Sequence, residues 1–164
     1  MKNRVRFTLI ELITVIAIIS ILVAILLPTL SSVREKARKT QAKAEMNSII
    51  TAIKSYESTY GVLPVPENWD NADTGTEYDN LMALLTDVIK TGGDSDYENT
   101  RHIRFLDVPD QYTTNGYLNP WDGKYEIYMD TDYNDELTGP DGTLYGTVFI
   151  TTTDGNNETV YSWK

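Results

Sequence analysis

The sequence predicts an α+β protein in which one long N-terminal helix, first membrane-spanning and then amphipathic, packs on a small antiparallel β-sheet. Residues 7–30 are almost entirely apolar, and residues 31–60 combine good helix formers with apolar positions at helical spacing. From residue 117 onward, β-branched and aromatic runs alternate with Asp, Gly and Asn turns. A helical block followed by a block of strands is typical of an α+β fold.

The apolar segment, residues 7–30, is long enough to cross a membrane. Its 24 residues carry one charge, that of Glu11. A helix rises about 1.5 Å per residue and a hydrocarbon core is about 30 Å thick, so this helix can span it. A carboxylate in such a helix is costly and usually has a partner or a function.

Two ordinary explanations of this segment are a secretory signal and an anchor. The basic residues 1–6 are typical of a signal, but the apolar core of a signal is about 7–15 residues long and ends in a small-residue cleavage site. No such site precedes the next helical segment. An uncleaved signal-anchor fits the length, but a plain anchor does not need Glu11.

Residues 6–12 (RFTLIEL) resemble the processing site of type IV pilins and of the pseudopilins of type II secretion systems. The resemblance implies that a prepilin peptidase cuts between Arg6 and Phe7, which removes residues 1–6 as a leader, and that the new N-terminus at Phe7 is methylated. It also implies that Glu11 pairs with the N-terminal amine of a neighbouring subunit in a filament. Arg6 stands where the family has Gly.

The orientation in the membrane has two conflicting indications. Three cations precede the span and five follow it within residues 34–43, and this count alone would place the C-terminal side in the cytoplasm. The family resemblance implies a single-pass protein of the inner (cell) membrane with its globular domain in the periplasm or outside. We expect the second arrangement.

The remaining chain divides into three segments by pattern. An amphipathic helix covers residues 31–61, because an apolar stripe (Val33, Ala37, Ala44, Ile49, Ile50, Ile53, Tyr56, Tyr60) recurs until Gly61 and two prolines end it. A connecting region follows at residues 62–116 and contains a short predicted helix at 79–90. Residues 117–164 form the sheet region, with strands predicted at 125–129, 147–152 and 159–163.

Charge separates the domain from the helix. Residues 55–164 carry a net charge of −16, whereas residues 34–54 carry +4. So acidic a domain is a poor binder of nucleic acid and is suited to divalent cations. The chain has no cysteine, so no disulfide framework exists.

Residues 119–125 (NPWDGKY) resemble the Asp-Pro-Trp-Gly-x-x-Tyr segment of major pseudopilins, with Asn119 in place of the Asp. Major pseudopilins commonly hold calcium in their C-terminal region. The resemblance, together with the absence of cysteine, therefore favours a major pseudopilin within the wider family.

The first candidate calcium loop is residues 130–141. Asp130, Asp132 and Asn134 place oxygen ligands at positions one, three and five, a spacing that suits Ca²⁺. The loop is not an EF-hand, because Asp135 stands where the turn needs Gly. The alternative is a hairpin turn rich in Asx residues.

The second candidate calcium loop, residues 154–158, resembles the C-terminal calcium loop of major pseudopilins and is followed, as in that family, by Ser162 and Trp163. By this resemblance Asp154 and Glu158 are its ligands. One ion shared between the two loops is a further possibility.

The sequence does not indicate an enzyme. It contains no nucleophile elbow, no phosphate-binding glycine loop and no His/Cys metal spacing, and His102 is the single histidine. A membrane-tethered hydrolase using two carboxylates is the enzymatic alternative.

The function implied by the resemblance is a structural subunit of a type II secretion pseudopilus, which drives protein export. Its expected partners are further copies of itself, other pseudopilins, the prepilin peptidase, the inner-membrane assembly platform and the membrane. A type IV or competence pilin, which forms a surface fibre, is one alternative. A single-pass, membrane-tethered binding domain is the other.

Overall fold

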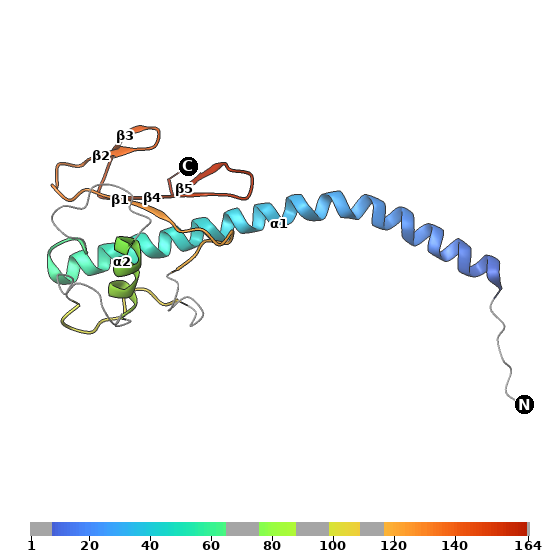
Figure 1. Cartoon of the computed structure of the whole chain (residues 1–164), viewed down its shortest axis with the longest axis horizontal. Helices are drawn as coiled ribbons and strands as arrows, with labels where there is room; N and C mark the ends of the chain where they lie inside the picture. The colour runs from blue at the N-terminus through green and yellow to red at the C-terminus, as the bar shows by residue number, and fades with distance from the viewer. Residues whose placement is uncertain (1–7, 65–75, 88–98, 109–116, 164) are drawn as a thin grey trace, which may run out of the picture. The chain divides into compact units, whose positions relative to one another are not determined.

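The computed structural model describes residues 8–64, 76–87, 99–108 and 117–163 (Figure 1). The chain divides into two compact units, Met1–Arg38 and Lys39–Lys164. The first unit consists of the N-terminal part of one helix. The second contains the remainder of that helix, a short helix and all the strands, so the predicted α+β fold is confirmed.

Helix α1 (Leu9–Tyr60) is continuous over 52 residues, so it passes through residue 28 without a break, as the sequence predicts. The C-terminal end of α1 is also where the sequence predicts it, just before Gly61. Gly61 adopts a φ of 79°, which places it in the left-handed region, and its N–H donates to the carbonyl of Glu57 at 2.7 Å. Glycine is favoured at this position because it has no Cβ, which would clash with the backbone at a positive φ.

Helix α2 (Thr76–Thr86) ends earlier than the predicted boundary at residue 90. Asp87 has a φ of 56°, which ends the helix. The carbonyl of Leu85, in the last turn of α2, accepts the N–H groups of both Phe105 and Leu106 at 2.9 Å. A segment distant in sequence therefore satisfies the carbonyl of Leu85, one of those left without a partner at the helix end. Gly92 and Gly93, which follow the predicted helix in the sequence and which we expected to cap it, lie outside the described residues.

The strands form two sheets. β1 (Glu126–Met129), β4 (Val148–Thr153) and β5 (Thr159–Tyr161) make an antiparallel sheet in the order β1-β4-β5, which confirms the three predicted strands. β2 (Glu136–Gly139) and β3 (Gly142–Tyr145) form a separate hairpin between β1 and β4. The sequence interpretation missed this hairpin and assigned residues 130–141 to a loop. Four-residue strands of mostly exposed residues are too short to show a clear alternation.

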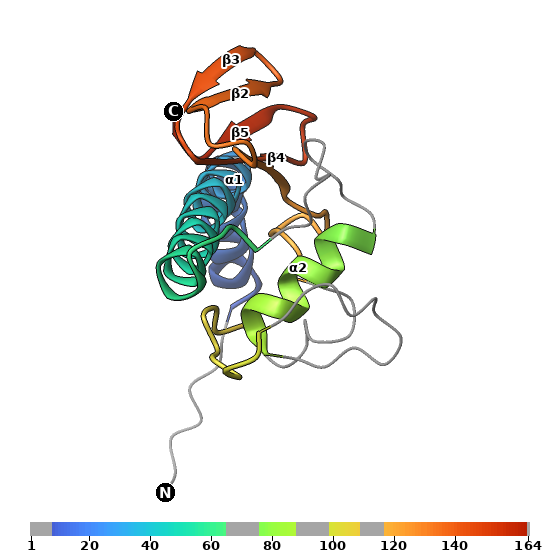
Figure 2. The ribbon, with the colours of Figure 1, turned by 90° about the vertical axis from the view of Figure 1, so that its left-hand side faces the viewer.

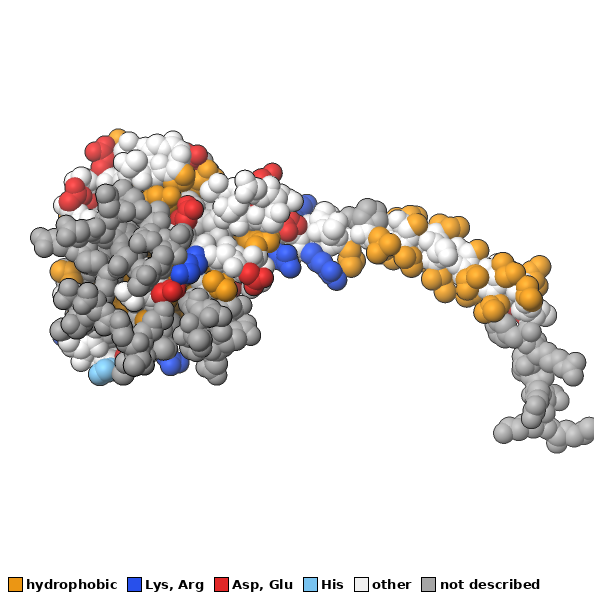
Figure 3. Space-filling view, in the orientation of Figure 1, with side chains coloured by type: hydrophobic (Ala, Val, Ile, Leu, Met, Phe, Trp, Pro, Cys, Tyr) orange, Lys and Arg blue, Asp and Glu red, His pale blue; other side chains and the backbone are white. Residues whose placement is uncertain are grey.

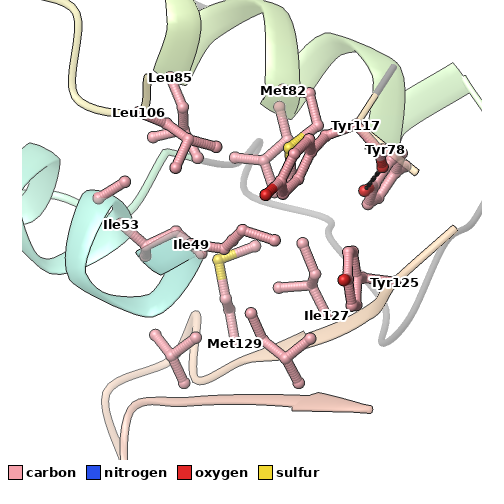
Figure 4. Close-up of a cluster of buried hydrophobic side chains, with 14 of the residues drawn as sticks. Ile49, Ile53, Tyr78, Met82, Leu85, Leu106, Tyr117, Tyr125, Ile127 and Met129 are labelled. Carbon is pink, nitrogen blue, oxygen red and sulfur yellow. Dashed lines mark hydrogen bonds between the residues drawn. The ribbon is translucent and has the colours of Figure 1, made fainter. Parts of the chain in front are cut away.

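The core of the second unit is formed by buried side chains of α1, α2 and the three-stranded sheet (Figure 4). Figure 2 shows the ribbons of α2 and of the sheet on different sides of α1. From α1 come Met46, Ile49 and Ile53, none of them exposed to solvent, and they belong to one buried cluster with residues of α2 and β1. Figure 4 shows Ile49 and Ile53 between Leu85 and Leu106 on one side and Ile127 and Met129 on the other. One stripe of α1 therefore serves as the common packing surface.

The buried stripe of α1 differs in part from the predicted one. Ile49, Ile53 and Tyr56 are buried as predicted, but the stripe continues toward the N-terminus through Met46 and Ala42. Ala44 is exposed, so its assignment to the stripe was wrong. Val33 and Ala37, which belong to the first unit, are also exposed.

Two buried tyrosines carry their polar ends into hydrogen bonds. The Tyr78 hydroxyl donates to the carbonyl of Tyr117, and the Tyr125 hydroxyl donates to the Glu45 carboxylate of α1. Burial, reinforced by Glu45, raises the pKa of Tyr125 far above its usual range. The neutral phenol is therefore the form that the core accepts.

We expect Ile49→Ala to lower the free energy of unfolding by about 2–5 kcal/mol, because Ile49 is fully buried and its truncation leaves a cavity. Val62→Ala is the control, because Val62 is 54% exposed and its loss should change stability by less than about 0.5 kcal/mol. Urea unfolding of the detergent-solubilised chain, followed by tryptophan fluorescence, measures both. Equal effects of the two substitutions would contradict the assigned core.

Candidate functional site

The N-terminal part of α1, residues 9–27, exposes its large apolar side chains. Their exposed fractions run from 44% for Val23 to 75% for Leu9, and Figure 3 shows apolar side chains along this part of the helix. Soluble monomers rarely expose a contiguous apolar surface of this kind. Among the described residues, α1 is the one helix that is long and apolar enough to cross a membrane. This is compatible with single-pass anchoring.

The polar residues within this segment are satisfied by the helix itself. The hydroxyls of Thr14 and Ser20 donate to the carbonyls of Ile10 and Ile16, each at 2.7 Å. Such bonds let a hydroxyl enter an apolar environment at low cost. Glu11 is different, because it carries a charge.

Glu11 forms a capping box with Thr8 at the start of α1. The Glu11 carboxylate Oε2 accepts the Thr8 N–H at 2.8 Å and the Thr8 hydroxyl at 2.6 Å. In return, the Glu11 N–H donates to the Thr8 hydroxyl oxygen at 3.3 Å. This reciprocal arrangement satisfies N–H groups that have no partner at a helix start.

The sequence interpretation assigned Glu11 to assembly and missed this local function. The signal was present, because Thr8 and Glu11 have the Ser/Thr-x-x-Glu spacing of a capping box before an apolar run. The capping box and the assembly function do not exclude each other. The two Thr8 donors share Oε2, and Oε1 remains for another donor. The predicted processing residues, Arg6 and Phe7, lie outside the described residues.

In the second unit, Asp154 closes the turn between β4 and β5. Its side chain is fully buried. Oδ1 accepts the N–H groups of Asn156 at 2.9 Å and Glu158 at 2.8 Å. The backbone N–H of Asp154 donates to the carbonyl of Glu158 at 2.9 Å, so the residue binds both ends of the turn.

The cation beside Asp154 is the ammonium of Lys39, from α1. Its Nζ lies 2.8 Å from Asp154 Oδ2 and 2.9 Å from Glu158 Oε2. Lys39 lowers the pKa of Asp154, and the two carboxylates raise the pKa of Lys39 well above its usual value. The predicted ligands Asp154 and Glu158 are therefore brought together, but around a lysine.

The other predicted ligands, Asp130, Asp132 and Asn134, are also brought together. Asp130 is 2% exposed, and its two carboxylate oxygens accept the N–H groups of Asn134 at 3.2 Å and Asp135 at 2.7 Å. The Asn134 side chain donates to Asp132 Oδ2 at 2.7 Å. Most of the oxygens in this turn thus bind donors of the turn itself, which is the Asx alternative.

The two acidic loops do not share a site. The N–H of Asp130 donates to the carbonyl of Thr147, just before β4 begins, whereas Asp154 follows directly after β4 ends. A strand rises about 3.3 Å per residue, so the length of β4 separates the two loops by about 20 Å. The possibility of one shared ion is therefore wrong. Within the described part of the chain, no three His, Cys, Asp or Glu residues are placed to hold a metal ion.

Asn119 organises the turn that leads into β1, and it was singled out in the sequence for its resemblance to a family motif. The side chain is buried, and Oδ1 accepts the N–H groups of Trp121 at 2.8 Å and Gly123 at 2.9 Å. Its amide nitrogen donates to the hydroxyl of Thr152 on β4. A Cβ at position 123 would lie 2.9 Å from that nitrogen, which explains the glycine.

A long, apolar N-terminal helix whose later part packs on a small antiparallel sheet is a pilin-like architecture. The chain is 44% identical over 57 residues to the type IV wide pilus major component PilA4 of Thermus thermophilus. The match covers 35% of this chain and 44% of that relative, so this chain spans less than half of the relative's length. No family model and no solved structure matches the chain. The partial similarity and the fold support a pilin-like protein.

We expect Asn119→Leu to destabilise the second unit by about 1–3 kcal/mol for each buried N–H group left without an acceptor. Asn119→Asp is the matched control. It keeps Oδ1 as the acceptor for Trp121 and Gly123, and the Thr152 hydroxyl can donate to the new carboxylate. Urea unfolding should therefore place Asn119→Asp closer to the unmodified chain. The assigned function of Oδ1 would be contradicted if the Leu variant were the more stable one.

Proposed function

We propose that this chain is a filament subunit that resides in the cell membrane through α1 before assembly and packs this helix against those of other copies afterwards. The observation that carries the proposal is the apolar surface of residues 9–27, which is exposed in the chain by itself and contains one carboxylate. A bilayer satisfies such a surface in the subunit, and neighbouring helices satisfy it in a filament.

Glu11 sets the register of assembly in this proposal. Its Oε2 is held by Thr8 at the start of the helix, so the position of the carboxylate relative to the helix is defined. The N-terminal amine of a neighbouring subunit neutralises the charge, which is expensive to leave unpaired in an apolar environment. A charge buried among apolar helices is best attested as a device that selects one register.

Processing prepares this amine. A prepilin peptidase removes residues 1–6 and the new N-terminus at Phe7 is methylated. The inner-membrane assembly platform then moves the subunit from the bilayer into the filament, with the acidic second unit on the periplasmic or outer side. These steps follow from the resemblance of residues 6–12 to prepilin processing sites.

The finer assignment that we propose is a type II secretion pseudopilus, in which this chain assembles with other pseudopilins to drive protein export. The resemblance of the Asn119 turn to the major-pseudopilin segment and the absence of cysteine support it. The buried Asn119, with bonds to three residues, gives this motif a structural function.

A type IV pilin is the second candidate, because the relative from Thermus thermophilus is a component of a type IV pilus. Deletion of the gene separates the two. Loss of exported proteins, without loss of a surface fibre, supports the pseudopilus, and loss of a fibre visible by negative-stain microscopy supports the pilus.

We expect Glu11→Ala to abolish filaments in electron micrographs while the protein remains in the membrane fraction. Thr8→Val is the matched control, because it disturbs the capping box but keeps the carboxylate and the backbone N–H at residue 8 that binds it. It should still assemble. If both variants lost assembly equally, the helix start and not the carboxylate would be responsible. If neither did, the tethered binding domain would be the better explanation.

Intact-mass measurement of the protein extracted from its native membrane should give a chain that begins at N-methylated phenylalanine, residue 7. The expected mass is that of the full chain, lowered by the removal of residues 1–6 and raised by the addition of one methyl group. A chain that retains Arg6 would contradict processing at this bond. The mass of an Arg6→Gly variant then shows whether the residue before the cut is the cause.

A further inference from the structure

We infer that the Lys39 ammonium is the resident cation of the turn between β4 and β5, so that this turn closes without a divalent metal ion. This inference concerns the position where resemblance to major pseudopilins implies calcium. It does not depend on filament assembly.

The turn needs a cation because the Asp154 carboxylate is fully buried. Two backbone N–H groups, from Asn156 and Glu158, satisfy Oδ1. Oδ2 is shielded from solvent and accepts no hydrogen bond from the described residues, and an uncompensated negative charge at such an atom is expensive. The group that lies against Oδ2, at 2.8 Å, is the Lys39 ammonium.

The ammonium also connects the two ends of the turn. Lys39 Nζ donates to Glu158 Oε2 at 2.9 Å, so one lysine contacts the residue that begins the turn and the residue that ends it. The Lys39 side chain is 33% exposed and that of Glu158 is 69% exposed, whereas that of Asp154 has no exposure. The buried contact with Asp154 is therefore the important one, and the contact with Glu158 is screened by water.

The donor set does not fit Ca²⁺ while Lys39 is in place. Calcium takes six to eight oxygen ligands at about 2.3–2.6 Å. Here the acidic side chains of the turn supply two carboxylates, and Oδ1 of Asp154 is already engaged with the backbone, so most ligands would have to be amide or backbone oxygens. An ion at Oδ2 would occupy the position of the ammonium, and the two positive charges would repel each other.

The lysine performs the structural task that a bound ion would perform. It fixes the β4–β5 turn to α1, because Lys39 belongs to α1 and Asp154 directly follows β4. A side chain of the helix supplies the charge at all times, so the closed turn does not depend on the calcium concentration outside the cell.

Thermal unfolding of the full chain in detergent tests the inference. Tryptophan fluorescence reports on the second unit, because all three tryptophans lie in it. For the unmodified chain we expect the same Tm in EDTA and in millimolar calcium. We expect Lys39→Met to lower Tm by about 5 °C or more, since it leaves a buried carboxylate without its counter-charge.

Two further variants keep the test informative if Lys39→Met does not fold. Lys39→Arg retains the charge and should keep a Tm above that of Lys39→Met, or fold where that variant does not. Lys54→Met, the control, removes an exposed lysine of the same helix and should leave Tm unchanged. A Tm of the unmodified chain that falls in EDTA and recovers with calcium would overturn the inference. So would a Lys39→Met variant as stable as Lys54→Met.

Discussion

The second unit depends on one constraint, the packing of α2 and the three-stranded sheet on a single stripe of α1. Met46, Ile49 and Ile53 are fully buried in one cluster with residues of α2 and of the sheet. A sheet of three short strands and an 11-residue helix bury too little surface to be stable separately. The stripe of α1 supplies the common surface. Phe105 and Leu106 add to this assembly by donating their N–H groups to the carbonyl of Leu85 at the end of α2.

Two acidic side chains in this unit act as turn-forming groups. Asp130 and Asp154 each accept two backbone N–H groups at the ends of strands, and Asn119 does the same before β1. A carboxylate that binds two N–H groups replaces hydrogen bonds that the sheet no longer provides. Part of the acidic composition that suggested metal binding therefore has a local structural explanation.

Glu11 has an observed function in the single chain and a proposed one in the filament. In the single chain its carboxylate caps α1 through Thr8, which stabilises the helix start. In the proposed filament it neutralises a neighbour's amine. The capping bonds already hold the carboxylate in one orientation in the single chain. Pairing with a neighbour's amine therefore costs less side-chain entropy.

The sequence by itself determined the elements whose signals are local and long: the apolar span, the continuous helix to Gly61, and the three strands of the sheet. The periodicity of apolar residues and the positions of turn residues predict these elements, because both signals depend only on residues that are neighbours along the chain. Only the tertiary structure decided which residues of α1 face the core, since Ala44 and Ala42 are equally apolar in sequence and differ in what lies opposite. It also placed the two acidic loops at opposite ends of β4. It brought Lys39 into contact with Asp154, which lies 115 residues further along the chain. No local pattern encodes such a contact, because the partner of a buried charge is chosen by the packing of α1 on the sheet.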